Sequence, residues 1–108
     1  MKIIAGPCQH ENILESFEIA SHCRRVCEDL GFEYFFKASF DKANRSSKDG
    51  IRGIGFDKTM HDFRLIKEKH GDNLKILTDV HTVEQIESIV KDYSHIIDVL
   101  QIPAFLCR

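Results

Sequence analysis

Apolar positions along the first half of the chain follow two patterns, one typical of buried strands and one typical of helices. Lys2–Gly6 is a short, β-branched apolar run followed by proline, which predicts a buried strand and then a loop. From Ile13 to Leu30 the apolar residues recur at helical spacing, and Gly31 stands where a glycine commonly ends a helix. The aromatic-rich Glu33–Phe40 predicts a second strand, whereas Asp41–Phe56 has little periodicity and is expected to be a loop.

The second half continues the alternation. Lys58–His70 is expected to be a helix that stops at Gly71, and Lys75–Val80 a strand. Thr82–Tyr93 predicts a helix with Thr82 as its N-cap, and Ile96–Ile102 predicts a fourth strand that is broken by proline. The order βαβαβαβ specifies an α/β fold with parallel strands and helices packed against them.

No helix is expected after the fourth strand, although a parallel strand normally needs cover on both faces. A closed (β/α)8 barrel takes about 250 residues, so residues 1–108 are expected to form a single partial domain, the first half of a TIM barrel, truncated after its fourth strand. A four-stranded open sheet is the competing interpretation.

Composition and charge narrow the class of protein. With 43% apolar and 30% charged residues the chain is typical of globular proteins, and no apolar run reaches the roughly 20 residues that cross a bilayer. We expect a cytoplasmic protein with no membrane partner, because no export leader is visible. The net charge of −2 argues against a nucleic-acid partner. The four cysteines show no disulfide or zinc spacing, so reduced thiols are expected.

One segment departs from this acidic balance. Between Lys37 and Lys58 there are six basic and three acidic residues, which suits a small anionic ligand. A solvated loop explains the same charges equally well.

Candidate chemistry gathers where the expected strands end, and in parallel α/β folds ligands bind at these carboxyl ends. Cys8 follows the first strand, and Lys37 lies near the end of the second. The third strand leads into Asp79 and His81, and the fourth ends near Gln101. Asp79 and His81 are two residues apart, so both side chains point to the same side. They form either an orienting pair for a proton transfer or a metal, or simply a buried hydrogen-bonded pair.

The remaining candidates also have two interpretations each. Asn44, Arg45, Ser46 and Ser47 offer an amide, a guanidinium fork and two hydroxyls that suit a phosphate, or they cap a helix. Cys8 is a ligand or a structural thiol, and Lys37 binds an anionic ligand or an internal carboxylate. The other histidines lack useful spacing and are expected at the surface: His10, His22, His61, His70 and His95.

Several motifs, taken together and in order, resemble a known family. They are Ile4-Ala5-Gly6-Pro7-Cys8, Phe36 to Ser47, Arg52-Gly53, Thr78-Asp79-Val80-His81 and Gln101 to Leu106. The whole chain resembles the first part of the 3-deoxy-D-manno-octulosonate 8-phosphate synthases, also called 2-dehydro-3-deoxyphosphooctonate aldolases. The segment Lys42-Ala43-Asn44-Arg45-Ser46 is specific, because the related heptulosonate 7-phosphate synthases typically carry Lys-Pro-Arg-Thr/Ser there.

The resemblance implies a condensation of phosphoenolpyruvate with arabinose 5-phosphate that releases phosphate and forms the eight-carbon sugar acid of lipopolysaccharide. It assigns Lys37 and Lys42 to phosphoenolpyruvate and the sugar aldehyde, and Asn44, Arg45 and Ser46 to the sugar phosphate, partly across a subunit interface of a homo-oligomer. Substrate binding or catalysis is also implied for the positions Arg52, Asp79, His81 and Gln101.

Cys8 matches the cysteine of the metal-dependent branch, where it is one ligand of a divalent metal. The other ligands lie in the family's second half, so this chain is expected to bind no metal and to be inactive by itself. We also expect it to aggregate, because the outer edges of the Lys2–Gly6 and Ile96–Ile102 strands are unpaired.

Three other functions are weighed against this one. The chain is a non-catalytic remnant that retains at most anion binding, a heptulosonate-type synthase, or a free-standing receiver-like module. A receiver-like module is the weakest of these interpretations, because such modules need an acidic cluster after the first strand and Gly6-Pro7-Cys8 supplies none.

Overall fold

The computed structural model describes residues 1–40, 55–71 and 74–104, and in them strands and helices alternate. The four strands form one parallel sheet in the order β1-β2-β3-β4. The elements are β1 (Lys2–Ala5), α1 (Ile13–Leu30), β2 (Glu33–Lys37), α2 (Phe56–His70), β3 (Lys75–Asp79), α3 (Val83–Asp92) and β4 (Val99–Gln101). The predicted α/β fold, the arrangement of the first half of a TIM barrel, is confirmed.

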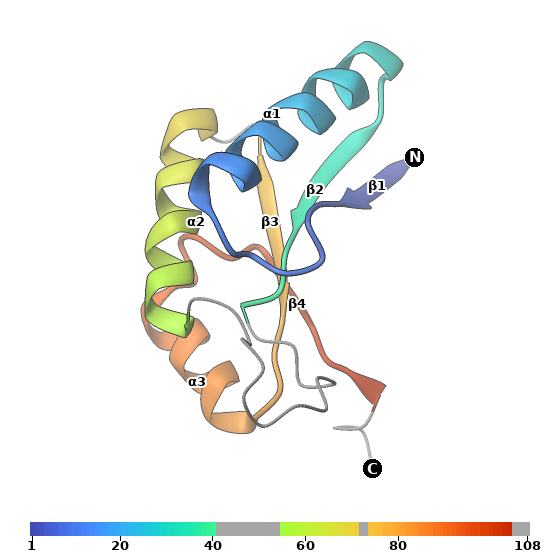
Figure 1. Ribbon diagram of the computed structural model, residues 1–108. Coiled ribbons are helices and arrows are strands. Elements are labelled where there is room, and N and C mark those ends of the chain that lie inside the picture. The colour runs from blue at the N-terminus through green and yellow to red at the C-terminus, as the bar shows by residue number, and fades with distance from the viewer. Residues whose placement is uncertain (41–54, 72–73, 105–108) are drawn as a thin grey trace.

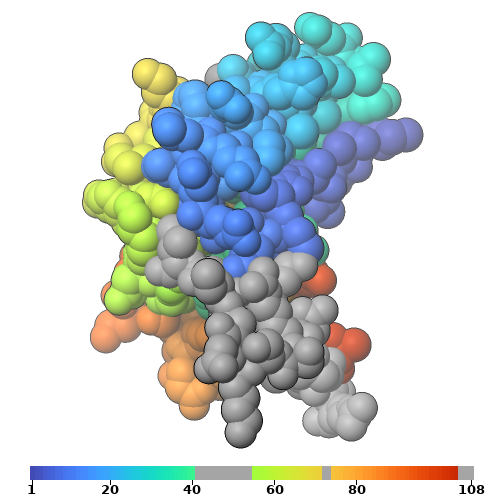
Figure 2. Space-filling view, in the orientation of Figure 1, coloured from blue at the N-terminus to red at the C-terminus, as the bar shows by residue number. Residues whose placement is uncertain are grey.

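The three helices lie against one side of the sheet and bury its core there (Figure 1). The space-filling view shows α2 along one flank and α1 across the front of the strands (Figure 2). Alternate strand residues such as Tyr34, Phe36 and Ile76 pack into this core with Met60 and Phe63 of α2. The Tyr34 hydroxyl donates to the Ala5 carbonyl at 2.7 Å, and burial raises the pKa of this phenol.

Local sequence determines where two of the helices begin. Asn12 caps α1 by accepting from the amides of Leu14 and Glu15. At α3, Thr82 and Gln85 form a reciprocal capping box, which satisfies amides that have no partner within the helix. Gly31 ends α1 in the left-handed conformation, with φ of 73°. The Thr82 cap and the Gly31 stop are therefore confirmed.

Several predicted boundaries are wrong. The fourth strand begins only at Val99, because the amides of Ile96 and Ile97 both donate to the Tyr93 carbonyl in a turn that follows α3. Both isoleucines are still buried, so their apolar character reflects packing in the core and not strand pairing. Phe56, predicted as the end of a loop, is the first residue of α2. The second strand ends at Lys37, three residues earlier than predicted.

The surface position predicted for His10 is also wrong. Its side chain is 0% exposed and bonds to Ser16 and Asp62, at 2.7 and 2.8 Å. His22, His61 and His95 are exposed as predicted, whereas His70 is partly buried beside Phe17 and Ser21.

The amino edge of the sheet is held by charged side chains. Lys75 donates to Glu33 at 2.9 Å, which lowers the pKa of Glu33 and raises that of Lys75. The ammonium groups of Lys2 and Lys75 lie 6.0 and 5.5 Å from the centre of the Phe35 ring, so two cations contact one aromatic ring. Among the residues described, no helix has the length and apolar character needed to cross a membrane.

Gly6 gives the first prediction. A Cβ atom at this position would stand 1.9 Å from the Lys37 carbonyl oxygen, so β1 and β2 have to separate in Gly6→Ala. We expect Gly6→Ala to lower the free energy of unfolding by about 3 kcal/mol or more. Gly31→Ala is the control, since nothing lies within 4 Å of its Cβ, and strain alone costs about 1–2 kcal/mol. Equal losses in urea unfolding would contradict the close approach.

His70 gives a prediction about pH. Burial, with a smaller contribution from the Arg24 charge, lowers the pKa of His70 below its ordinary value of 6.5. The unfolded chain therefore takes up the proton first as the pH falls, so His70 stabilises the fold fully above pH 6.5 and progressively less below it. We expect the fall in Tm between about pH 7.5 and 5.5 to be smaller in His70→Gln. His22→Gln, at an exposed position of α1, should behave as the wild type.

Candidate active site

Three of the predicted site residues lie on one face of the sheet, at its carboxyl edge. Lys37 pairs in register with Leu77, and Asp79 pairs with Gln101. Because side chains two residues apart on a strand share a face, Lys37, Asp79 and Gln101 all lie on the face opposite the helices. The sheet thus brings a cation, a carboxylate and an amide to one edge.

The segment after β1 reaches the same edge. The Ser39 amide donates to the Cys8 carbonyl at 3.4 Å, and Gln9 forms an isolated parallel bridge with Ser39. Gly6 makes this possible, because only a residue without a side chain can approach the Lys37 backbone so closely. Cys8 is exposed beside this pairing.

Asp79 and His81 form the hydrogen-bonded pair that their spacing predicts. His81 Nε2 lies 3.0 Å from Asp79 Oδ2, and their side chains are only 9% and 16% exposed. The His81 amide donates to the Gln85 side chain at 2.7 Å, which holds the histidine at the start of α3. Asp79 Oδ1 is buried, and it accepts no hydrogen bond within the part of the chain that the structure describes.

Sequence reasoning missed Gln9. Its side chain is 7% exposed, yet neither amide atom makes a hydrogen bond to any described residue. A buried amide without partners is costly, so it commonly marks a position where a ligand or water supplies the missing bonds. Nothing in the residue pattern around Gln9 distinguishes it from a surface glutamine.

Five predicted site residues lie outside the described residues: Lys42, Asn44, Arg45, Ser46 and Arg52. The described cysteines Cys8, Cys23 and Cys27 form no disulfide. Within residues 1–40, 55–71 and 74–104, no three His, Cys, Asp or Glu side chains are placed to hold a metal ion. One thiolate does not bind a metal tightly, so the described residues do not fit a divalent ion by themselves.

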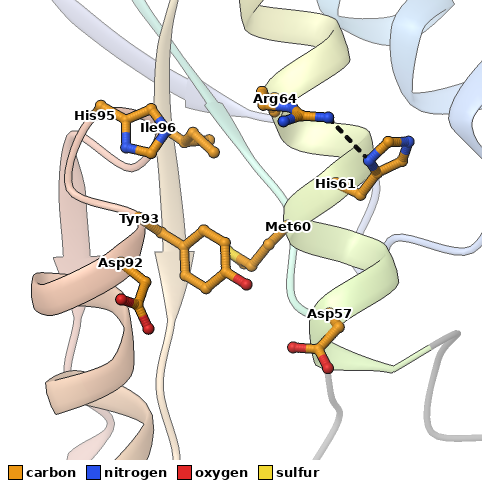
Figure 3. Close-up of a pocket in the computed structure, with 8 residues that line it drawn as sticks. All are labelled: Asp57, Met60, His61, Arg64, Asp92, Tyr93, His95 and Ile96. Atoms are coloured by element: carbon orange, nitrogen blue, oxygen red, sulfur yellow. Dashed lines mark hydrogen bonds between the residues drawn. The ribbon is translucent and has the colours of Figure 1, made fainter.

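A cleft of about 290 Å³ lies away from these residues, between α2 and the end of α3 (Figure 3). Its lining consists of Asp57, Met60, His61, Arg64, Asp92, Tyr93, His95 and Ile96. The Tyr93 ring lies next to Met60 in this view, and Arg64 donates to His61 at 3.3 Å. None of the predicted site residues lines this cleft.

The Asp79–His81 contact gives a prediction about the imidazole. In the neutral ring a proton on Nε2 donates to Asp79, so one tautomer is favoured. We expect Asp79→Asn to keep this tautomer, because its amide oxygen still accepts, and Asp79→Leu to give a mixture. Nitrogen-15 shifts of the His81 ring measure the tautomer. A wild-type ring with its proton on Nδ1 would contradict the bond.

Comparison with known proteins gives the family. The sequence matches the DAHP synthetase I family over residues 1–108. It is 44% identical over 108 residues to proteins of Brucella canis and Brucella suis named 2-dehydro-3-deoxyphosphooctonate aldolase, covering 100% of this chain and 37% of each relative. A protein of the same name from Dechloromonas aromatica is 44% identical over 106 residues, which cover 98% of this chain and 36% of that relative. The chain thus spans little more than a third of these relatives, and it belongs to the DAHP synthetase I family.

Proposed function

We propose that the chain forms the first half of the barrel of an enzyme that condenses phosphoenolpyruvate with D-arabinose 5-phosphate. The products are 3-deoxy-D-manno-octulosonate 8-phosphate and inorganic phosphate, in the cytoplasm and for lipopolysaccharide synthesis. The relatives named 2-dehydro-3-deoxyphosphooctonate aldolase favour this reaction. The observation on which the proposal rests is the convergence of Lys37, Asp79 and Gln101 on one carboxyl edge of the sheet.

Charge explains why this edge suits the two substrates. Both carry phosphate groups, so they repel each other unless cations hold them together in the right orientation. Lys37 supplies one cation on the face opposite the helices. Lys42 supplies a second cation, next to the sugar aldehyde. The sugar phosphate is bound by Asn44, Arg45 and Ser46. Arg52 adds a further positive charge.

The neutral and acidic groups at the edge orient the substrates. Asp79 orients the His81 ring through the bond to Nε2, and an imidazole held in this way suits a proton transfer at this edge. Gln101 lies opposite Asp79 in the register. The buried Gln9 amide, next to Cys8 in the chain, bonds to no described residue, so we add it to the substrate-binding residues.

Two further features belong to the proposed enzyme. Cys8 serves as one ligand of a divalent metal whose other ligands come from the part of the relatives that this chain does not span, and the metal supplies charge stabilisation when bound. The active enzyme is a homo-oligomer, because residues of the Asn44–Ser46 run complete a neighbouring subunit's sugar-phosphate site. In this proposal residues 1–108 form one partial domain, and they do not catalyse the reaction alone.

A heptulosonate 7-phosphate synthase is the second candidate, because the family that the chain matches is described by the DAHP synthetase activity. The segment Lys42-Ala43-Asn44-Arg45-Ser46 favours the octulosonate reaction over this one. The test must therefore offer both sugar phosphates.

A chimera provides this test. The chain replaces the matching segment of the Brucella suis relative, with which it aligns over 108 residues. We expect phosphate release from phosphoenolpyruvate with arabinose 5-phosphate and much less with erythrose 4-phosphate. The reverse preference would establish the heptulosonate reaction. A folded chimera that turns over neither sugar, beside an active parent, would support the non-catalytic remnant and overturn the proposal.

Arg45 gives the prediction at residue level. A guanidinium–phosphate contact contributes about 1.5–3 kcal/mol, so Arg45→Ala in the chimera should weaken arabinose 5-phosphate binding about tenfold or more. The KM for phosphoenolpyruvate should change much less. Arg25→Ala, at an exposed position of α1, is the matched control. Equal losses for the two substrates would contradict the assignment of Arg45 to the sugar phosphate.

A further inference from the structure

A buried polar cluster joins three parts of the fold next to the candidate site. His10 Nδ1 lies 2.7 Å from Ser16 Oγ of α1, and His10 Nε2 lies 2.8 Å from Asp62 Oδ2 of α2. All three side chains are at most 1% exposed. Lys58 donates to the other oxygen of Asp62 at 3.1 Å. We call Ser16, His10 and Asp62 the clasp.

A neutral imidazole satisfies every member of the clasp. Its Nε2 proton donates to Asp62, and its Nδ1 accepts the Ser16 hydroxyl proton. The cluster is too deeply buried to meet a substrate, since His10 and Asp62 are 0% and 1% exposed. A catalytic role for the clasp is therefore excluded, although its residue types are those of a catalytic triad.

Stability alone does not explain the clasp. Buried polar pairs give little net stabilisation, and apolar residues of similar volume often replace them without loss. Such a pair instead fixes the relative position of the segments it joins, because hydrogen bonds hold their partners within a narrow range of distances and angles. The question is then which part of the chain the clasp holds in place.

The backbone of His10 gives the answer. Its amide donates to the Ser39 carbonyl at 2.8 Å, and the Ser39 amide donates to the Cys8 carbonyl at 3.4 Å. The segment Cys8–His10 is thus paired on one side with the continuation of β2, two residues beyond Lys37. On the other side the His10 ring fastens the same segment to α2, 52 residues along the chain.

We propose that His10 is a positioning residue that acts through Asp62 and Ser16. It holds the segment Cys8–His10 at the carboxyl edge, so that Cys8 and Gln9 keep a fixed place relative to Lys37. The relevance of that edge to catalysis rests on the proposed function, whereas the positioning itself does not. Without the clasp the Ser39 pairing opens while the rest of the sheet stays closed.

Amide hydrogen exchange in the folded chimera tests this proposal. The variant His10→Leu/Asp62→Leu fills the same space with apolar side chains. We expect the amides at positions 10 and 39 to exchange about tenfold faster or more, while those of Phe36 and Ile76 in the sheet keep their wild-type rates. Asp62→Asn should restore slow exchange in the presence of His10, because its amide oxygen still accepts the Nε2 proton. His22→Leu, at an exposed position of α1, is the control.

The outcomes separate positioning from a merely structural role. Equal acceleration at all four amides would mean that the clasp only stabilises the whole fold, and no acceleration at positions 10 and 39 would mean that it holds nothing; either overturns the proposal. If the double variant does not fold, Ser16→Ala removes one bond and should give a smaller change at the same two amides. This measurement needs no enzymatic activity. If the chimera is inactive but the double variant shows faster exchange at positions 10 and 39, only the proposed function is refuted. If the chimera is active and the exchange at these positions does not change, only the positioning role of His10 is refuted.

Discussion

The backbone of Lys37 occupies the space where a side chain at position 6 would stand, with its carbonyl oxygen 1.9 Å from an added Cβ atom. This contact allows β1 and β2 to end side by side, and the candidate site depends on it. The Cys8–His10 segment then runs next to Ser39, and Lys37 lies at the same edge as Asp79 and Gln101. A parallel sheet places all its carboxyl ends together, but the close contact at glycine brings the first loop within reach of the second strand.

Much of this arrangement is predictable from sequence because it depends on local patterns. Helical spacing from Ile13 to Leu30, the Thr82 cap and the strand predicted at Lys75–Val80 correctly give the element order, and the order gives the parallel sheet. The Asp79–His81 pair is equally local, since the two residues are only two positions apart in the sequence.

The missed features depend on distant partners. His10 looks like a surface histidine until α2, 52 residues away, brings Asp62 against it. Ile96 and Ile97 suit a strand by residue type, yet their amides donate to the Tyr93 carbonyl in a turn and their side chains pack in the core. Gln9 is notable only because it is buried while its amide bonds to no described residue, and burial is a property of the assembled fold. In each case tertiary packing outweighs local propensity.

Each strand in this sheet pairs with strands that are adjacent to it in the sequence. This neighbour-by-neighbour pairing keeps the connections as short as a parallel sheet allows, although each still spans a whole helix. It also suits a chain that leaves the ribosome amino end first, because each new strand finds its partner already synthesised. The bond between His10 and Asp62 is different, since β1 and β2 have both emerged before α2 offers its carboxylate. During synthesis the first loop of the site therefore stays unrestrained until α2 has emerged. The His10–Asp62 bond fixes this loop only once β1, α1, β2 and α2 have begun to pack together.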